Sequence, residues 1–297
     1  SRYNYFYANY LYNLGRIEDA KKILNSSTEL YPRNLLLNQF KIDLVIKNNF
    51  KSSFNCKKQS NVIAEILYIT ANAFSSQSMY SLSNFYLNLS KYLNKDFFSF
   101  NTLLAENFYK IENFNKSKKI YNKIKKQGSA YLWYATKQKA RIFQKEKNND
   151  EAIKLMTENY EKLKYKNIYD TFDFAEFLKR NKKYEKAINY YTEIIQLINK
   201  DHPLYPEITD GRGVAYERLG EWEKAEKDLL ASLEADPNQA YVINYLAYSW
   251  IEKGVKIEKS LKMLERANNL KSNDPYIIDS LGWALFKLKK YEESKNY

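Results

Sequence analysis

Few residues in this chain could carry out chemistry. Its one histidine, His202, lies beside a proline in the segment NKDHPLYP, and its one cysteine, Cys56, lies far away in the sequence. A Cys–His nucleophile pair or a zinc site needs such side chains at close spacing. The Gly211-Arg212-Gly213 triplet resembles part of a phosphate loop, but no Gly-Lys-Ser or Gly-Lys-Thr follows it. No carboxylate pair stands out for acid–base work, so we expect no enzyme activity, metal or cofactor.

Charge is distributed unevenly. The chain has 48 Lys and Arg against 35 Asp and Glu, a net charge of +13. Residues 101–150 hold 12 basic against 4 acidic residues, whereas residues 206–240 hold 4 against 9. Much of the basic excess lies in KSKKIYNKIKK, which we interpret as a solvated helix face. The alternative is a surface for nucleic acid or an anionic membrane.

The composition indicates that the chain is built from helices. Only 7 glycines and 5 prolines occur in 297 residues, too few for the many special turns of an all-β fold. The clearest helical unit runs from Pro206 to Pro237, with Gly213 on its first helix, the turn LGEWEKAEKDLL and Ala225 on its second. Small residues at such positions let two antiparallel helices approach closely. No run of about 18 apolar residues, the length that spans a membrane, is present.

This unit resembles the tetratricopeptide repeat. In that family a small residue at position 8 packs against small residues at positions 20 and 27, and proline at position 32 ends the unit. The template also fits units starting near residues 1, 34, 64, 98, 133, 168, 206 and 240, with a truncated ninth from residue 275. The second unit has the turn NNFKSS with Ser53 as a small residue, but Lys41 stands at position 8, so the register of the second and third units stays open.

The resemblance implies an all-α fold, a right-handed superhelical solenoid of antiparallel helix pairs that contact mainly their neighbours. We expect a single solenoid over residues 1–297 with about eight full repeats and both ends cut. The stretch from NYLAYSWIEKG to LKKYEES is similar to a block found in long multi-repeat proteins of proteobacteria. Pentatricopeptide repeats have a similar length and bind RNA, but the unit ends LEADP and LYP favour the tetratricopeptide family.

The resemblance also implies a function. In the family, positions 2, 5, 9 and 12 of the first helices build a concave face that binds a peptide or a partner helix. We therefore predict a non-catalytic protein-interaction scaffold with a protein or peptide partner and without nucleic acid. The alternatives are binding of nucleic acid or an anionic membrane, and a docking module of a larger enzyme or envelope-assembly protein. The predicted partner-binding residues are Tyr241, Asn244, Tyr248, Tyr276, Asp279, Trp283, Glu207, Asp210, Glu217, Lys137 and Arg141.

The predicted face changes from acidic in the unit at Pro206 to aromatic in the last two units, which suits a ligand with a basic end and an apolar end. The family's clamp for C-terminal carboxylates is not expected, because Arg141 stands where the clamp needs asparagine. The chain opens and closes within helical patterns, and we interpret it as a piece of a longer protein. The compartment stays open between a bacterial cytoplasm and periplasm, and the oligomeric state stays open too.

Overall fold

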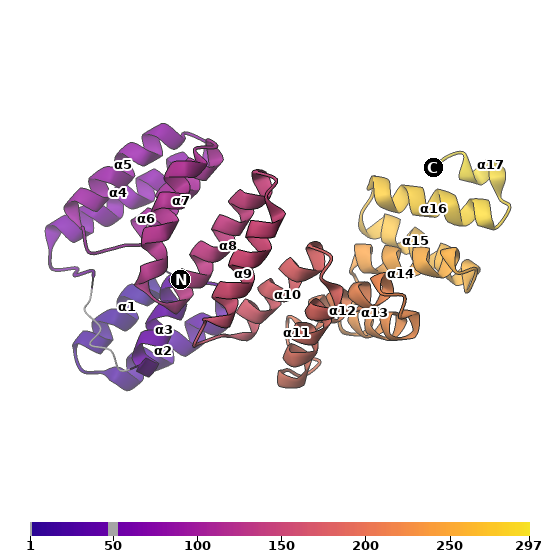
Figure 1. The fold of residues 1–297 in the computed structure, drawn as a ribbon, viewed down its shortest axis with the longest axis horizontal. Helices are drawn as coiled ribbons and strands as arrows, with labels where there is room; N and C mark the ends of the chain where they lie inside the picture. The colour runs from indigo at the N-terminus through magenta and orange to yellow at the C-terminus, as the bar shows by residue number, and fades with distance from the viewer. Residues whose placement is uncertain (1, 47–52) are drawn as a thin grey trace. The chain divides into compact units, whose positions relative to one another are not determined.

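The computed structural model describes residues 2–46 and 53–297, and every regular element in these two ranges is helical (Figure 1). The all-α prediction is thereby confirmed. The elements are α1 (Arg2–Asn13), α2 (Ile17–Leu30), α3 (Leu35–Ile46), α4 (Gln59–Ser76), α5 (Tyr80–Leu93), α6 (Phe100–Lys110), α7 (Phe114–Ile124), the short 3-10 helix η1 (Lys125–Gln127), α8 (Ser129–Lys145), α9 (Asn149–Glu161), α10 (Ile168–Arg180), α11 (Tyr184–Leu197), α12 (Tyr205–Arg218), α13 (Trp222–Ala235), α14 (Ala240–Glu252), α15 (Ile257–Leu270), α16 (Pro275–Lys287) and α17 (Tyr291–Ser294).

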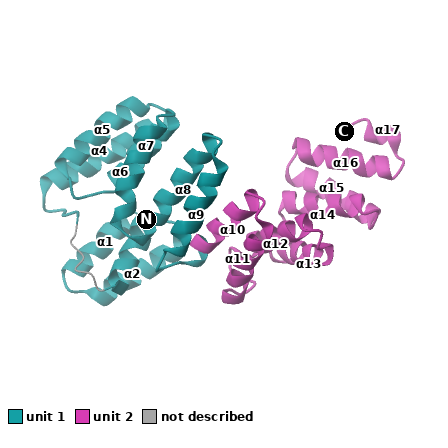
Figure 2. Ribbon diagram, viewed as in Figure 1, with its two compact units in different colours: residues 1–169 teal, residues 170–297 magenta. Residues whose placement is uncertain are grey.

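The chain divides into two compact units, residues 1–169 and residues 170–297 (Figure 2). In the second unit α12 pairs with α13, α14 with α15, and α16 with α17. The first helices of these pairs begin at Tyr205, Ala240 and Pro275, beside the predicted starts. The repeat division of the whole chain, and one solenoid over all of it, stay predictions. No helix within the described residues is long and apolar enough to cross a membrane.

Small residues allow the close approach of the helices in the pairs α12–α13 and α6–α7. A Cβ added to Gly213 on α12 would lie 3.0 Å from Leu229 and 3.2 Å from the carbonyl oxygen of Ala225 on α13. In the pair α6–α7, Ser117 Oγ donates a hydrogen bond of 2.9 Å to the carbonyl of Ala105, and both residues are fully buried. A larger side chain at either place would push the helices apart and leave voids, which close-packed interiors do not tolerate.

Helix α3 departs from the expected pattern. The predicted second helix of its unit would follow the turn NNFKSS, most of which lies outside the described residues; Ser53 and the residues up to Lys58 are not helical, and α4 begins at Gln59. Instead α3 packs against α1, α2 and α8. Gln39 Oε1 accepts a hydrogen bond of 3.0 Å from the Ala130 backbone N–H near the start of α8. The expectation that each repeat contacts mainly its neighbours is therefore wrong for α3, because α3 packs against α8, the fifth α-helix after it.

Gly128 makes this contact possible. It precedes α8 with a φ of +133°, a conformation that L side chains rarely adopt, and a Cβ added there would lie 2.2 Å from the Gln39 side chain. The Gln39 amide also donates to Asp43 Oδ1 at 2.7 Å. Burial raises the pKa of Asp43, and this hydrogen bond partly offsets the rise.

Candidate partner-binding surface

Three first helices of the second unit, α12, α14 and α16, carry nine of the predicted residues. Aromatic donors link these helices through carboxylates. Tyr245 on α14 donates to Glu217 on α12 at 2.8 Å, and Trp283 on α16 donates to Glu252 on α14 at 2.6 Å. Because each bond ties one first helix to the next, the three helices form one continuous surface, which we call the inner surface.

Three predicted tyrosines on the inner surface are exposed: Tyr241, Tyr248 and Tyr276. The Tyr241 hydroxyl donates to Asp274 Oδ2 at 2.8 Å, and Lys271 Nζ lies 3.9 Å from its ring centre. Burial raises the pKa of Tyr248, and the carboxylates of Glu252 and Asp279 raise it further. Tyr248 is thus an exposed aromatic ring with negative charge around it.

Trp283 and Asn244 are less accessible. The Trp283 ring is partly buried and stacks on Phe286 with 5.4 Å between centroids and 7° between planes, so much of its surface is used inside the chain. Asn244 is also partly buried, and its Oδ1 atom is buried without a hydrogen-bond partner. An unsatisfied buried acceptor costs free energy, and an incoming N–H group would relieve that cost.

The acidic end of the inner surface contains a carboxyl group with a shifted pKa. The pKa of Asp210 on α12 is raised to about 6, first by burial and then by the charges of Glu176 and Glu207, against the lowering effect of Lys179. The Tyr191 hydroxyl donates a short hydrogen bond to Glu176. Burial and Glu176 together raise the pKa of Tyr191 far above its usual value. Ionising Asp210 beside Glu176 and Glu207 therefore costs free energy in the folded chain.

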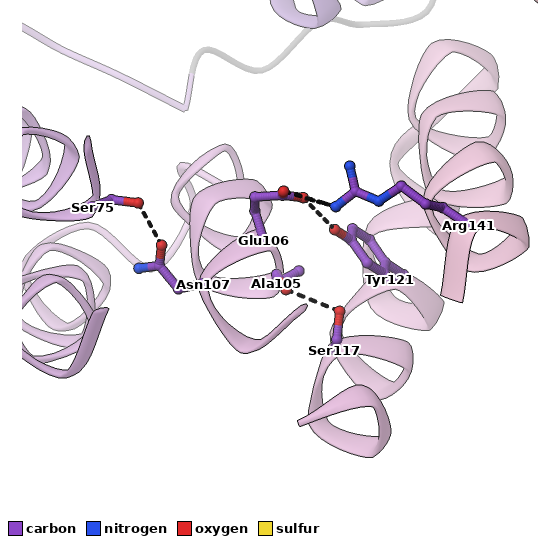
Figure 3. Close-up of polar contacts among 7 residues, drawn as sticks. All are labelled: Ser75, Ala105, Glu106, Asn107, Ser117, Tyr121 and Arg141. Atoms are coloured by element: carbon purple, nitrogen blue, oxygen red, sulfur yellow. Dashed lines mark hydrogen bonds and ion pairs between the residues drawn. The ribbon is translucent and has the colours of Figure 1, made fainter. Parts of the chain in front are cut away.

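The two remaining predicted residues, Lys137 and Arg141, lie on α8 in the first compact unit, so the structure does not place them on the inner surface. Arg141 donates to both carboxylate oxygens of Glu106 on α6 at 2.8 and 3.0 Å, and its guanidinium carbon lies 3.7 Å from the Tyr109 ring centre. Tyr121 donates to the same carboxylate at 3.4 Å (Figure 3). Arg141 is therefore already neutralised within the chain, and a partner would have to compete with Glu106.

Sequence reasoning named Glu217 but missed Glu252 and Glu106, the other carboxylates that organise these contacts. Glu252 lies 35 residues after Glu217, about one repeat later. It stands at position 13 of the unit that starts at residue 240, one position after the last of the positions (2, 5, 9 and 12) that were expected to face inward. A second signal was available in the spacing of glutamate and tyrosine. Glu106 precedes Tyr121 by 15 residues, Glu176 precedes Tyr191 by 15, and both pairs are hydrogen bonded.

A cavity of about 730 Å³ lies elsewhere, in the first unit, between α1 and the segment before α4. Its lining includes Tyr10, Asn13 and the exposed Cys56. The buried Nδ2 atom of Asn9, which also lines it, lacks a hydrogen-bond partner. None of the predicted partner-binding residues lines this cavity. His202, in the loop before α12, accepts a hydrogen bond at Nδ1 from the Leu204 backbone N–H.

Comparisons with known proteins agree with the repeat pattern. A family model for the tetratricopeptide repeat matches residues 1–34. The TPR repeat-containing protein PA4667 of Pseudomonas aeruginosa is 27% identical over 123 residues, which are 41% of this chain. The match covers only 20% of that relative's length.

Solved structures share the fold. PilW, described as a widely conserved type IV pilus biogenesis factor, matches with a TM-score of 0.55 at 16% identity, over 67% of this chain and 90% of its own. The APC/C hetero-tetramer Cut9–Hcn1 matches with a TM-score of 0.55 at 16% identity, over 94% of this chain and 54% of its own. The C-terminal part of a TPR repeat-containing protein of Cytophaga hutchinsonii gives 0.53 at 14% identity, over 77% and 88%. The matched repeat, the related sequence and the shared fold together support a tetratricopeptide repeat protein.

Proposed function

We propose that this chain is a non-catalytic scaffold that holds an extended peptide or a partner helix against the inner surface of α12, α14 and α16. The tetratricopeptide fold implies protein interaction in general. The observation that carries the finer proposal is the exposure of Tyr241, Tyr248 and Tyr276 beside several carboxylates, in a chain whose net charge is +13.

Exposed tyrosines suit a binding surface, because aromatic side chains dominate interface energies. They also lose little conformational entropy, having only two side-chain torsions. The hydrogen bonds of Tyr245 and Trp283 fix the three helices before a partner arrives. A surface that is already ordered loses less conformational entropy on association.

The charges of the inner surface favour a partner segment with a basic end. Glu207, Asp210 and Glu217 lie on α12, whereas α14 carries one charged residue, Glu252. A basic side chain beside Asp210 would stabilise its ionised form, and apolar side chains would cover the tyrosines of α14 and α16. We therefore propose a ligand with basic residues near α12 and apolar residues near α16.

The experiment compares Tyr248→Ala with Tyr165→Ala in binding to an array of basic–apolar peptides. The two tyrosines are 39% and 37% exposed, but Tyr165 belongs to the first unit and is not carried by α12, α14 or α16. Tyr248→Ala should weaken binding by about 1–2 kcal/mol, roughly tenfold, with an unchanged melting temperature. Tyr165→Ala should change neither. A lower melting temperature with intact binding for Tyr248→Ala would show that the ring stabilises the fold instead.

Salt dependence separates this proposal from its rival. Burial lowers the pKa of Lys139, and the positive charges of Lys125 and Lys118 lower it further. Such a basic cluster could meet phosphates. Binding to duplex DNA would weaken with salt by a logarithmic slope of about 0.9 per neutralised phosphate. Tight, steeply salt-dependent DNA binding, with no peptide bound, would favour the rival.

A further inference from the structure

The pair α4–α5 exposes an apolar face that the inner surface does not explain. Only Glu65 and Lys91 are charged among residues 59–93, whereas charged residues make up 28% of the chain, and Glu65 is buried. The two helices nevertheless expose a series of large apolar side chains, which we call the α4–α5 face: Ile63, Ile66, Leu82, Phe85, Leu89 and Tyr92.

The contacts of α6 show where this face points. The fully buried Asn107 of α6 accepts a hydrogen bond from Ser75 of α4 at 2.6 Å (Figure 3). It donates to Ser83 and Asn84 of α5 at 2.8 and 2.9 Å. Since successive helical residues turn by about 100°, the residues of the α4–α5 face lie on the side turned away from α6.

In a stacked repeat architecture that side packs against the preceding helix pair. Here α3, the helix before α4, packs against α1, α2 and α8 instead. The side on which the preceding repeat would stack is therefore exposed on α4 and α5. This follows from the same rearrangement that places Gln39 of α3 beside the start of α8.

We propose that the α4–α5 face binds the same face of a second copy of this chain, as a symmetric antiparallel four-helix contact. Charge selects this occupant. Two molecules of charge +13 repel each other, so a contact between copies is least opposed at a face that carries almost no charge. An acidic or basic partner would gain nothing from such a face, since it offers no opposite charge.

Geometry supports a two-fold contact. Leu82, Phe85, Leu89 and Tyr92 follow one another at intervals of 3, 4 and 3 residues, the spacing that packs helices side by side in four-helix bundles. A two-fold interface uses one surface patch on both subunits, and the α4–α5 face is one such patch. From the exposed fractions of its six side chains, the face offers roughly 600–700 Å², somewhat less than the share of about 800 Å² that each partner gives to a standard interface.

The test is sedimentation velocity of the 297-residue protein with Leu89→Glu and Leu230→Glu. These leucines are 38% and 42% exposed, but Leu230 lies on α13 in the other compact unit. The unmodified chain should sediment as a dimer at about 50 µM. Leu89→Glu should raise the dimer dissociation constant at least about 100-fold, because each copy would bury a carboxylate. Leu230→Glu should leave the dimer intact.

Two further measurements keep the outcome clear. Ile66→Glu on α4 should disrupt the dimer as Leu89→Glu does, and helical content by circular dichroism should stay unchanged in all variants, because the replaced side chains are exposed. Raising sodium chloride from about 50 to about 500 mM should strengthen the dimer, since salt screens the repulsion. A chain that is monomeric at both salt concentrations overturns the proposal and leaves the face to another protein. A dimer that Leu89→Glu leaves intact also overturns it.

Discussion

Replacing Asp210 by asparagine should stabilise the protein above pH 6, although it removes a hydrophilic charge. The carboxyl group is partly buried on α12, and its pKa is raised from 3.8 to about 6. Burial is the main cause, and Glu176 and Glu207 add repulsion that Lys179 does not cancel. Asparagine has nearly the same shape and carries no charge, so it avoids the cost of ionisation.

The size and sign of the effect follow from the two pKa values. Below pH 4 the carboxyl group is protonated in both states, and the substitution should change little. Between about pH 4 and pH 6 the folded chain keeps the proton while the unfolded chain releases it, so the stability of the natural protein falls as pH rises. Each pKa unit corresponds to about 1.4 kcal/mol. Allowing for partial exposure, Asp210→Asn should gain about 2 kcal/mol at pH 8.

Urea unfolding of both proteins at pH 4, 6 and 8 measures this gain. Asp279→Asn is the matched control, because Asp279 is exposed on α16 and its replacement should change the free energy of unfolding by at most about 0.5 kcal/mol. A loss of stability at pH 8 for Asp210→Asn, or an equal gain at pH 4 and pH 8, would refute the reasoning. The same substitution should weaken binding of a basic peptide, because a stabilising change at a binding site commonly costs function.

Three further substitutions test contacts between helices, each by the free energy of unfolding in urea. Asp228→Ala should cost about 3 kcal/mol, because Arg212 loses bonds of 2.6 and 2.8 Å to a nearly buried carboxylate; adding Arg212→Met should recover much of that loss. Asn107→Ala should cost about 2–3 kcal/mol by leaving the buried Ser83 of α5 and the partly buried Ser75 of α4 without these bonds. Glu106→Gln should cost at most about 1 kcal/mol, because the ion pair with Arg141 is partly solvated.

The sequence by itself determined the helices and their pairing within a repeat. Gly213 and Ala225, or Ala105 and Ser117, lie 12 residues apart because a turn of fixed length joins two helices that touch there. Such contacts join residues that are close in the sequence, so small residues recur at the same spacing in successive repeats. The inner positions on α14 and α16 were predicted from the resemblance to the tetratricopeptide repeat, and the structure leaves Tyr248 and Tyr276 exposed.

Only the tertiary structure decided which contacts are made between distant helices. Gln39 meets Ala130 across 91 residues, and no repeat spacing records that α3 lies beside α8. Likewise, Arg141 occupies a position expected to face a partner, but Glu106, one repeat earlier, pairs with it. The physical reason is that the sequence of a helix determines which side chains lie on each of its faces. Which other helix covers that face depends on the competing packings of the whole chain, and these leave no pattern along the sequence.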